Sequence, residues 1–147
     1  MKHKGATMEY TMERINDLKR VYDECVSSCA YIRMDDVYEK VVNMPSSRFW
    51  VSDIRASLVV SAMMRGEANL NEMRTLGKEM YEEIYRRVME LKKTRPELST
   101  SELCAEVVMQ PAPKFYLTAG SAKMMICKAR KEWVKEKLQR LHLLSRR

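Results

Sequence analysis

Apolar residues recur at steps of three and four along most of the chain, a spacing that predicts helices rather than strands. In the first half, three such segments predict helices over residues 8–30, 35–43 and 53–65. The second helix ends near Pro45, because proline disfavours helical backbone in the residue before it. Gly66 is the predicted stop of the third helix.

The second half follows the same order. A long charged helix is predicted over residues 70–93, and Ser99 with Glu102 three residues later predicts a capping box for a short helix. Prolines then favour an extended link over residues 111–117. A last helix, capped by Thr118 or Ser121, is predicted to run almost to residue 147. About six helices joined by short links predict an all-α protein.

The third helix of the first half has a predicted start and a predicted environment. Ser52 precedes the third helix and is its predicted N-cap, with Asp53 in the first turn. Because residues 53–65 are apolar nearly all round, we expect that helix to be buried.

An internal repeat accounts for this order. Displacing the sequence by 66 residues brings Asp36–Val60 onto Glu102–Ile126, with five identities and eight conservative matches. The identical pairs are Val41/Val107, Val42/Val108, Pro45/Pro111, Phe49/Phe115 and Ala56/Ala122. We interpret the chain as one compact domain over residues 1–147 that contains two repeats, about 8–66 and 70–147.

Each repeat is a helix, a short helix, an extended link and a third helix. This order is helix-turn-helix-like, although the link of roughly eight residues is longer than the turn of about three or four in a compact unit. Segments 49–51 and 115–117 are rich in aromatic and β-branched residues and could pair as a small two-stranded ribbon between the copies.

Six residues of the repeated motif are candidates for the core or for the interface between repeats, because aromatic residues at equivalent repeat positions usually pack. They are Pro45, Phe49, Trp50, Pro111, Phe115 and Tyr116.

Charge divides the chain unevenly. Its 27 Lys and Arg against 20 Asp and Glu give a net charge of +7. Residues 1–120 contain 18 basic and 18 acidic side chains, whereas residues 121–147 contain nine basic and two acidic ones. A localised excess of this kind creates a field that attracts polyanions.

The basic C-terminal helix, residues 121–147, therefore predicts non-enzymatic nucleic-acid binding through phosphate contacts, to DNA or RNA. An inward stripe of Ile126, Ala129, Trp133, Leu138, Leu141 and Leu144 would leave the basic residues outside. The candidate nucleic-acid-binding residues are Lys114, Lys123, Lys128, Arg130, Lys131, Lys135, Lys137 and Arg140.

Two alternatives use the same features differently. The 13 methionines could make helix surfaces that self-associate, which would suit a structural or adaptor protein that forms a homo-oligomer. A basic amphipathic helix also suits a membrane surface, an interpretation that we rank lower.

Signals of catalysis or metal binding are missing from the sequence. One C-x-x-x-C spacing occurs, at Cys25 and Cys29, without a second pair to complete a zinc site. Cys104 and Cys127 lie on apolar helix faces, where buried free thiols are expected. We predict no cofactor, no metal and no enzymatic activity. With no apolar run of about 18 residues and no signal peptide, we expect a soluble cytoplasmic (intracellular) protein without a transmembrane segment.

The segments N-M-P-S-S-R-F-W-V-S (43–52) and M-Q-P-A-P-K-F-Y-L-T (109–118) resemble a P-A-P-R-F-Y-V-S motif in small uncharacterised proteins of gut-bacterial phages and mobile elements. The resemblance covers about a third of the chain and implies a phage or mobile-element setting. It assigns no functional residue. The match is better in the second segment, since the first departs from it at Ser46, Ser47 and Trp50.

Overall fold

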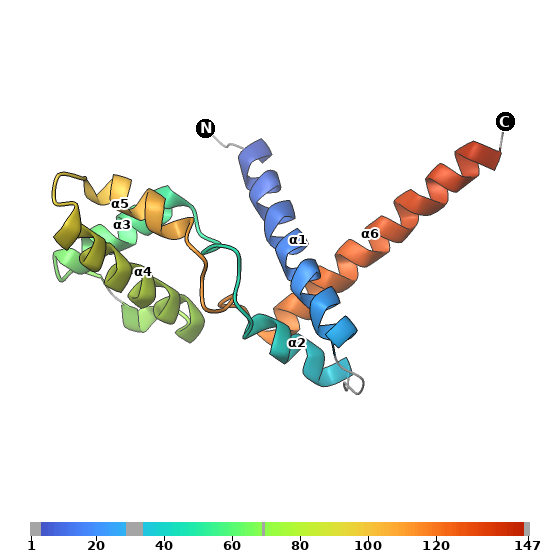
Figure 1. Cartoon of the computed structure of the whole chain (residues 1–147), viewed down its shortest axis with the longest axis horizontal. Coiled ribbons are helices and arrows are strands. Elements are labelled where there is room, and N and C mark those ends of the chain that lie inside the picture. Colours follow the sequence, from blue (N-terminus) through green and yellow to red (C-terminus); the bar gives the residue numbers. More distant parts are fainter. Residues whose placement is uncertain (1–3, 29–33, 69, 146–147) are drawn as a thin grey trace. The chain divides into compact units, whose positions relative to one another are not determined.

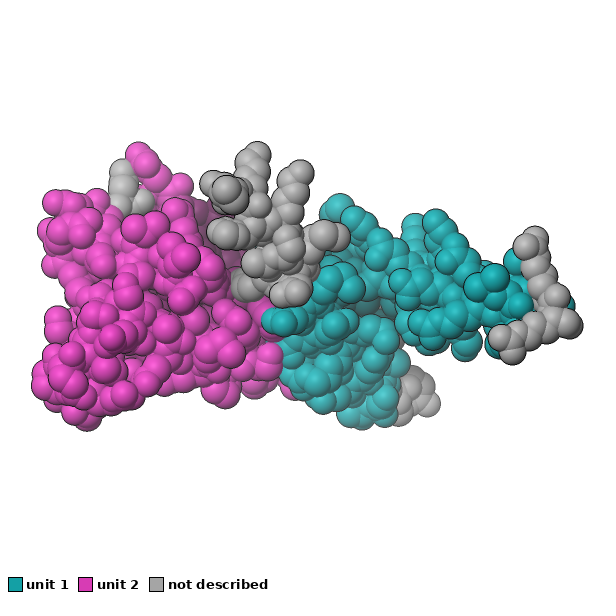
Figure 2. Space-filling model, turned by 90° about the horizontal axis from the view of Figure 1, so that it is seen from above, with its two compact units in different colours: residues 1–41, 118–147 teal, residues 42–117 magenta. Residues whose placement is uncertain are grey.

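The computed structural model describes residues 4–28, 34–68 and 70–145, and these are helical with short links (Figure 1). Six α-helices and one 3-10 turn are present, with no strand in the described ranges, which confirms the all-α prediction. The chain divides into two compact units, shown in different colours in Figure 2. Unit 1 comprises Met1–Val41 and Thr118–Arg147, and unit 2 comprises Val42–Leu117.

Unit 1 is built from α1 (Lys4–Ser28), α2 (Met34–Val42) and α6 (Ala119–Ser145). Each helix turns one apolar stripe inward. The buried side chains of these stripes are Leu18, Val21, Tyr22 and Cys25 of α1, Val37, Tyr38 and Val41 of α2, and Ala122 and Ile126 of α6.

Unit 2 packs α3 (Asp53–Met64), α4 (Thr75–Thr94) and α5 (Thr100–Val108) around a core that includes Phe49. The start predicted for α4 at residue 70 is wrong, because Leu70–Glu72 forms the 3-10 turn η1 and Arg74 is extended. Helical periodicity continues through such a turn, so the spacing of apolar residues alone cannot place the first helical residue.

Side-chain caps set three helix starts. Ser52 Oγ accepts a hydrogen bond from the Arg55 amide at 3.1 Å, which confirms the predicted cap of α3. The Ser99–Glu102 capping box is present at α5. Of the two alternatives for α6, Thr118 is the residue that accepts, from the Ser121 amide at 3.1 Å.

The two links between short and third helices meet inside unit 2. Ser46 and Ala112 form one isolated antiparallel bridge, with amide-to-carbonyl distances of 2.9 and 3.0 Å. This pairing lies three residues before segments 49–51 and 115–117, for which the sequence predicts a ribbon. Next to it, the Phe49 amide donates to Val108, and the Phe115 amide donates to Val42.

These hydrogen bonds recur at the displacement of 66 residues. Ser46 corresponds to Ala112, Phe49 to Phe115 and Val42 to Val108, so each of these four bonds has its counterpart. An ion-pair triad recurs as well: in α1, Arg20 pairs with Asp17 and Glu24, and in α4, Arg86 pairs with Glu83 and Glu90. The duplication itself stays a prediction.

The units do not coincide with the predicted repeats. The third helix of the first repeat, α3, packs against α4 and α5, whereas the third helix of the second repeat, α6, packs against α1. Each unit therefore combines helices from both predicted repeats.

Burial corrects two expectations from the sequence. Phe49 and Phe115 are buried, and Trp50 and Tyr116 are half-buried, but Pro45 and Pro111 are exposed and so are not core residues, and their place at the interface between repeats stays a prediction. A proline beside the bridge ends the helix before it and needs no burial to do so. Likewise α3 is not buried all round: it buries Ala56, Val59 and Val60 and exposes Ile54 and Leu58.

Candidate nucleic-acid interface

α6 is a helix with two different halves. Ala122 and Ile126 are fully buried, so its first half packs into the core of unit 1. From Arg130 to Ser145 every residue is exposed. The reason is visible in Figure 1, where α1 and α6 diverge toward the N-terminal end of α1 and the C-terminal end of α6.

The inward stripe predicted for α6 is therefore wrong beyond its first residues. Ile126 is buried and Ala129 is half-buried, as expected. Trp133, Leu138, Leu141 and Leu144 are more than half exposed. Their periodicity is that of an amphipathic helix, but α1 covers Trp133 only in part, and the other three side chains are open to solvent.

Seven of the eight candidate basic residues lie on α6, and the eighth does not. Lys114 belongs to the link in unit 2, where its ammonium pairs with Glu79 and lies 5.4 Å from the centre of the Tyr116 ring. It is a neutralised residue of that unit rather than part of the basic helix.

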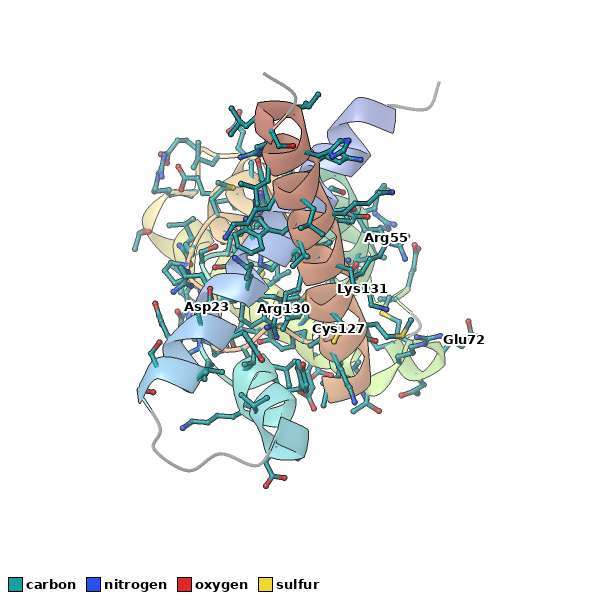
Figure 3. All side chains as sticks on the ribbon, turned by 90° about the vertical axis from the view of Figure 1, so that its right-hand side faces the viewer. Asp23, Arg55, Glu72, Cys127, Arg130 and Lys131 are labelled. Carbon is teal, nitrogen blue, oxygen red and sulfur yellow. The ribbon has the colours of Figure 1, made fainter. Side chains whose placement is uncertain are left out.

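Two basic residues of α6 pack on tyrosines. Tyr22 and Tyr38 stack with ring centres 5.7 Å apart. Arg130 donates to the Tyr22 hydroxyl at 3.2 Å and lies 5.6 Å from the centre of its ring, and Lys123 lies 6.0 Å from the centre of Tyr38. Figure 3 shows Arg130 and Lys131 on different sides of α6, close to Cys127.

Tyr38, the ring below Lys123, stays neutral at physiological pH. Burial raises the pKa of Tyr38 to about 12, and its contact with the Cys127 thiol, 3.7 Å away, acts in the same direction. Lys123 therefore lies over a neutral aromatic ring and gains no ionic partner there.

The other five basic residues of α6 form no ion pair with any part of the chain that the structure describes. Lys128, Lys131 and Lys135 follow at steps of three and four, so they form one row along the helix. Lys137 lies 5.0 Å from the centre of Trp133, and Lys19 of α1 lies 5.6 Å from the same ring.

A groove between α1 and α6 holds both acidic residues of the helix. The cavity has a volume of about 500 Å³, and Met12, Ile15 and Trp133 contribute apolar surface to it. Glu132 and Glu136 line it as well. The carboxylates are therefore turned toward α1, and Lys128, the first lysine of the row, lines the same groove.

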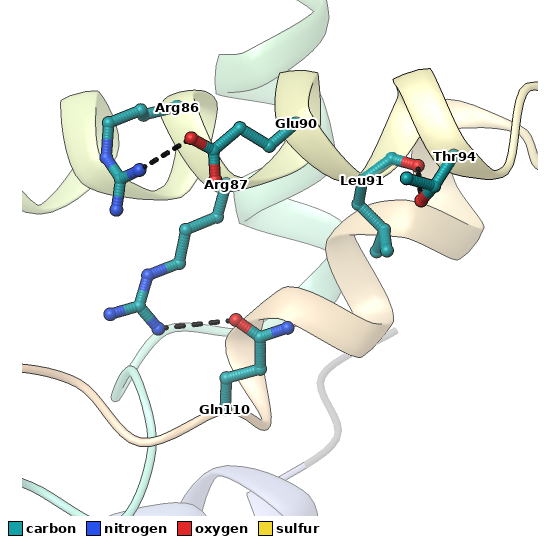
Figure 4. Close-up of a pocket in the computed structure, with 6 residues that line it drawn as sticks. All are labelled: Arg86, Arg87, Glu90, Leu91, Thr94 and Gln110. Atoms are coloured by element: carbon teal, nitrogen blue, oxygen red, sulfur yellow. Dashed lines mark hydrogen bonds and ion pairs between the residues drawn. The ribbon is translucent and has the colours of Figure 1, made fainter.

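Unit 2 contains a second cavity, of about 410 Å³, that sequence reasoning did not anticipate (Figure 4). Arg86 and Arg87 line it, but both have internal partners. Arg86 pairs with Glu83 and Glu90, and Arg87 pairs with Glu83 and donates to the Pro111 carbonyl at 2.8 Å. The hydrogen bonds from Arg86 are the main reason that the pKa of Glu83 lies below its usual value. Acidic residues three and four positions from these arginines are the signal that predicts such pairing.

The described cysteines are free thiols. Cys104 is buried, as predicted, and Cys25 is buried as well. Cys127 is only half-buried, which corrects the expectation that it is buried, and Cys29 lies outside the described residues. Burial raises the pKa of Cys104 to about 11, which keeps it protonated. Within the described ranges, no three His, Cys, Asp or Glu side chains gather in a way that could hold a metal ion.

None of the helices, as far as they are described, has the length and apolar content needed to cross a membrane. No family model, curated protein or solved structure matches this chain.

Proposed function

We propose that the protein is a non-enzymatic nucleic-acid-binding protein that contacts phosphates through the basic side chains of α6. The observation that carries the proposal is the lack of ion pairs along a whole basic helix. Lys19 and Arg20 of α1 and five basic residues of unit 2 form ion pairs, whereas the basic residues of α6 form none with the described residues.

Exposed lysines with no ion-pair partner are suited to a polyanion. Each phosphate they neutralise releases condensed counterions, and that release supplies the binding free energy without reading the base sequence. The row from Lys128 to Lys135 extends about 10 Å at 1.5 Å per residue. Several phosphates of a duplex or of a single strand lie within that length.

The rest of unit 1 holds this helix at a fixed angle. Ala122 and Ile126 are fully buried, and Arg130 is fastened to Tyr22 at the point where the exposed half begins. A rigid support matters because the stability of a helix in a protein comes mostly from the tertiary packing of one of its faces.

The test is fluorescence anisotropy with labelled duplex and single-stranded DNA and RNA over a salt series. In the variant Lys128→Glu, Lys131→Glu, Lys135→Glu, affinity should fall at least about tenfold, and the slope of log K against log salt should decrease by about two to three. The matched control is Arg55→Glu, Arg74→Glu, Lys78→Glu, which makes the same change in net charge at helix starts of unit 2, where acidic residues are tolerated.

Equal losses in the two triple variants would reduce the proposal to an effect of net charge and would contradict a site on α6. Absence of salt-dependent binding in the unaltered protein would contradict it outright.

A further inference from the structure

The exposed half of α6 carries an apolar stripe that phosphate binding does not use. Val134, Leu138 and Leu141 follow at steps of four and three, and their exposed fractions are 46%, 61% and 53%. We call these three residues the α6 stripe. The steps are those of alternating d and a positions in a heptad, which places Lys131 at the preceding a position.

The charged residues at the positions that flank the α6 stripe are all basic. In this heptad the e positions are Lys128, Lys135 and His142, and two of the g positions are Arg130 and Lys137, all of them exposed. The acidic residues Glu132 and Glu136 occupy b and f positions and line the groove toward α1. Flanking e and g positions decide which helices can pair, because they meet across the interface.

A second copy of the chain does not fit this surface. In a parallel pair Arg130 would face Lys135 of the other copy, and in an antiparallel pair equivalent lysines would face one another. Like charges opposed in this way disfavour pairing and select a partner of the opposite sign. Lys131 at an a position adds to the selection, since it needs an acidic or polar residue opposite.

We propose that residues 131–145 of α6 are a docking surface for a helix of another protein, with apolar a and d positions and acidic e and g positions. The partner's apolar residues cover the α6 stripe, and its carboxylates pair with Lys135 and Lys137. The proposal does not rest on nucleic-acid binding. Because both ligands use the same lysines, they exclude each other on α6.

The probe is a fluorescent designed peptide of about three heptads with Leu at a and d and Glu at e and g, titrated with the full chain at low salt. We expect saturable binding, and no binding of a twin peptide with Lys at e and g. Leu138→Asp should weaken binding at least about tenfold, because it places a carboxylate within the apolar contact.

Leu58→Asp is the matched control, because Leu58 is 62% exposed, close to the 61% of Leu138, but belongs to α3. Binding should persist in it with less than about a twofold change. Since residues 138 and 58 are both exposed, neither variant removes core packing, and circular dichroism should show the same helix content for both.

Three results would overturn the proposal. The first is equal binding of the peptide by Leu138→Asp and by the unaltered chain, which would mean charge attraction alone. The second is self-association of the chain that Leu138→Asp abolishes, and the third is binding to vesicles containing phosphatidylserine, but not to the peptide, that Leu138→Asp abolishes.

The nucleic-acid measurement separates this proposal from the proposed function. Leu138→Asp leaves all the lysines of α6 in place, so DNA or RNA binding should change less than about twofold even where the peptide no longer binds.

Discussion

The helices α3 and α6 begin in the same way and end differently. Ser52 and Thr118 cap them with the same hydrogen bond, and Ala56 and Ala122 are fully buried at the same distance from the cap. α3 then ends at Met64, before Gly66 with a φ of 70°, whereas α6 continues to Ser145. Similar starts thus lead to similar packing, and the added turns of α6 extend beyond the described helices of unit 1.

The basic residues of unit 2 and those of α6 also differ in their contacts. Unit 2 uses several of its arginines internally, and Arg87 contacts Glu83, the Pro111 carbonyl and the face of Phe49. In α6 the basic side chains reach solvent or rest on aromatic rings. A basic residue with internal partners contributes to stability, whereas one without them is available to a ligand.

The largest expected effect tests the two halves of α6. Ile126→Ala removes a fully buried side chain and should lower the free energy of unfolding by about 2–5 kcal/mol. Leu138→Ala, on the same helix but 61% exposed, should change it by less than about 0.5 kcal/mol. Urea unfolding followed by circular dichroism measures both, and comparable losses would show that the second half of α6 is packed.

A smaller effect tests the contrast in charge. Arg87→Ala leaves Glu83 with one arginine fewer and the Pro111 carbonyl without its donor, so we expect a loss of about 1–3 kcal/mol in unfolding free energy. Lys131→Ala should leave the urea midpoint unchanged, because Lys131 is exposed and has no ion-pair partner among the described residues. A shift of the midpoint by Lys131→Ala, with none by Arg87→Ala, would reverse the comparison.

The smallest effect concerns pH. Burial is the first cause that raises the pKa of Tyr38 in unit 1 and of Tyr116 in unit 2 to about 12, from an ordinary value of 10.0. Because the folded state favours the protonated phenol, this stabilisation is complete below pH 10 and is lost as the pH rises toward 12. Among the seven tyrosines, Tyr38 and Tyr116 should therefore ionise late in a titration followed by phenolate absorbance.

Single substitutions assign these late transitions to the two units. Tyr38→Phe should remove one late transition and Tyr116→Phe another, with the rest of the curve unchanged. Early ionisation of all seven tyrosines in the folded protein would contradict the burial of both rings.

Local patterns predicted most of the helices, because caps and prolines act within a few residues. Ser52, Ser99 and Pro45 each mark a boundary through a neighbouring backbone group, and the observed boundaries follow them. The start of α4 escaped prediction because the turn η1 lacks such a marker.

The candidate site could be predicted only in part. The position of the charge is a property of sequence, so seven of the eight basic residues do lie on one helix. Whether Leu138 faces a core or solvent depends on how far α1 accompanies α6, and that divergence is a matter of tertiary packing that periodicity does not encode. The pairing of Lys114 with Glu79, 35 residues away, is of the same kind.

The division of helices between the units also sets an order of events during synthesis. Unit 2 is one continuous segment of the chain, whereas unit 1 consists of two segments. The segment with α1 and α2 is synthesised before unit 2, and the segment with α6 after it. Because domains fold as units while the chain leaves the ribosome, the core of unit 2 can form before α6 is synthesised. The apolar faces of α1 and α2 then lack their contacts with Ala122 and Ile126 until α6 has been made. The helix that closes unit 1 is the same helix that carries the basic surface, so the nascent chain acquires this surface only as its last unit assembles.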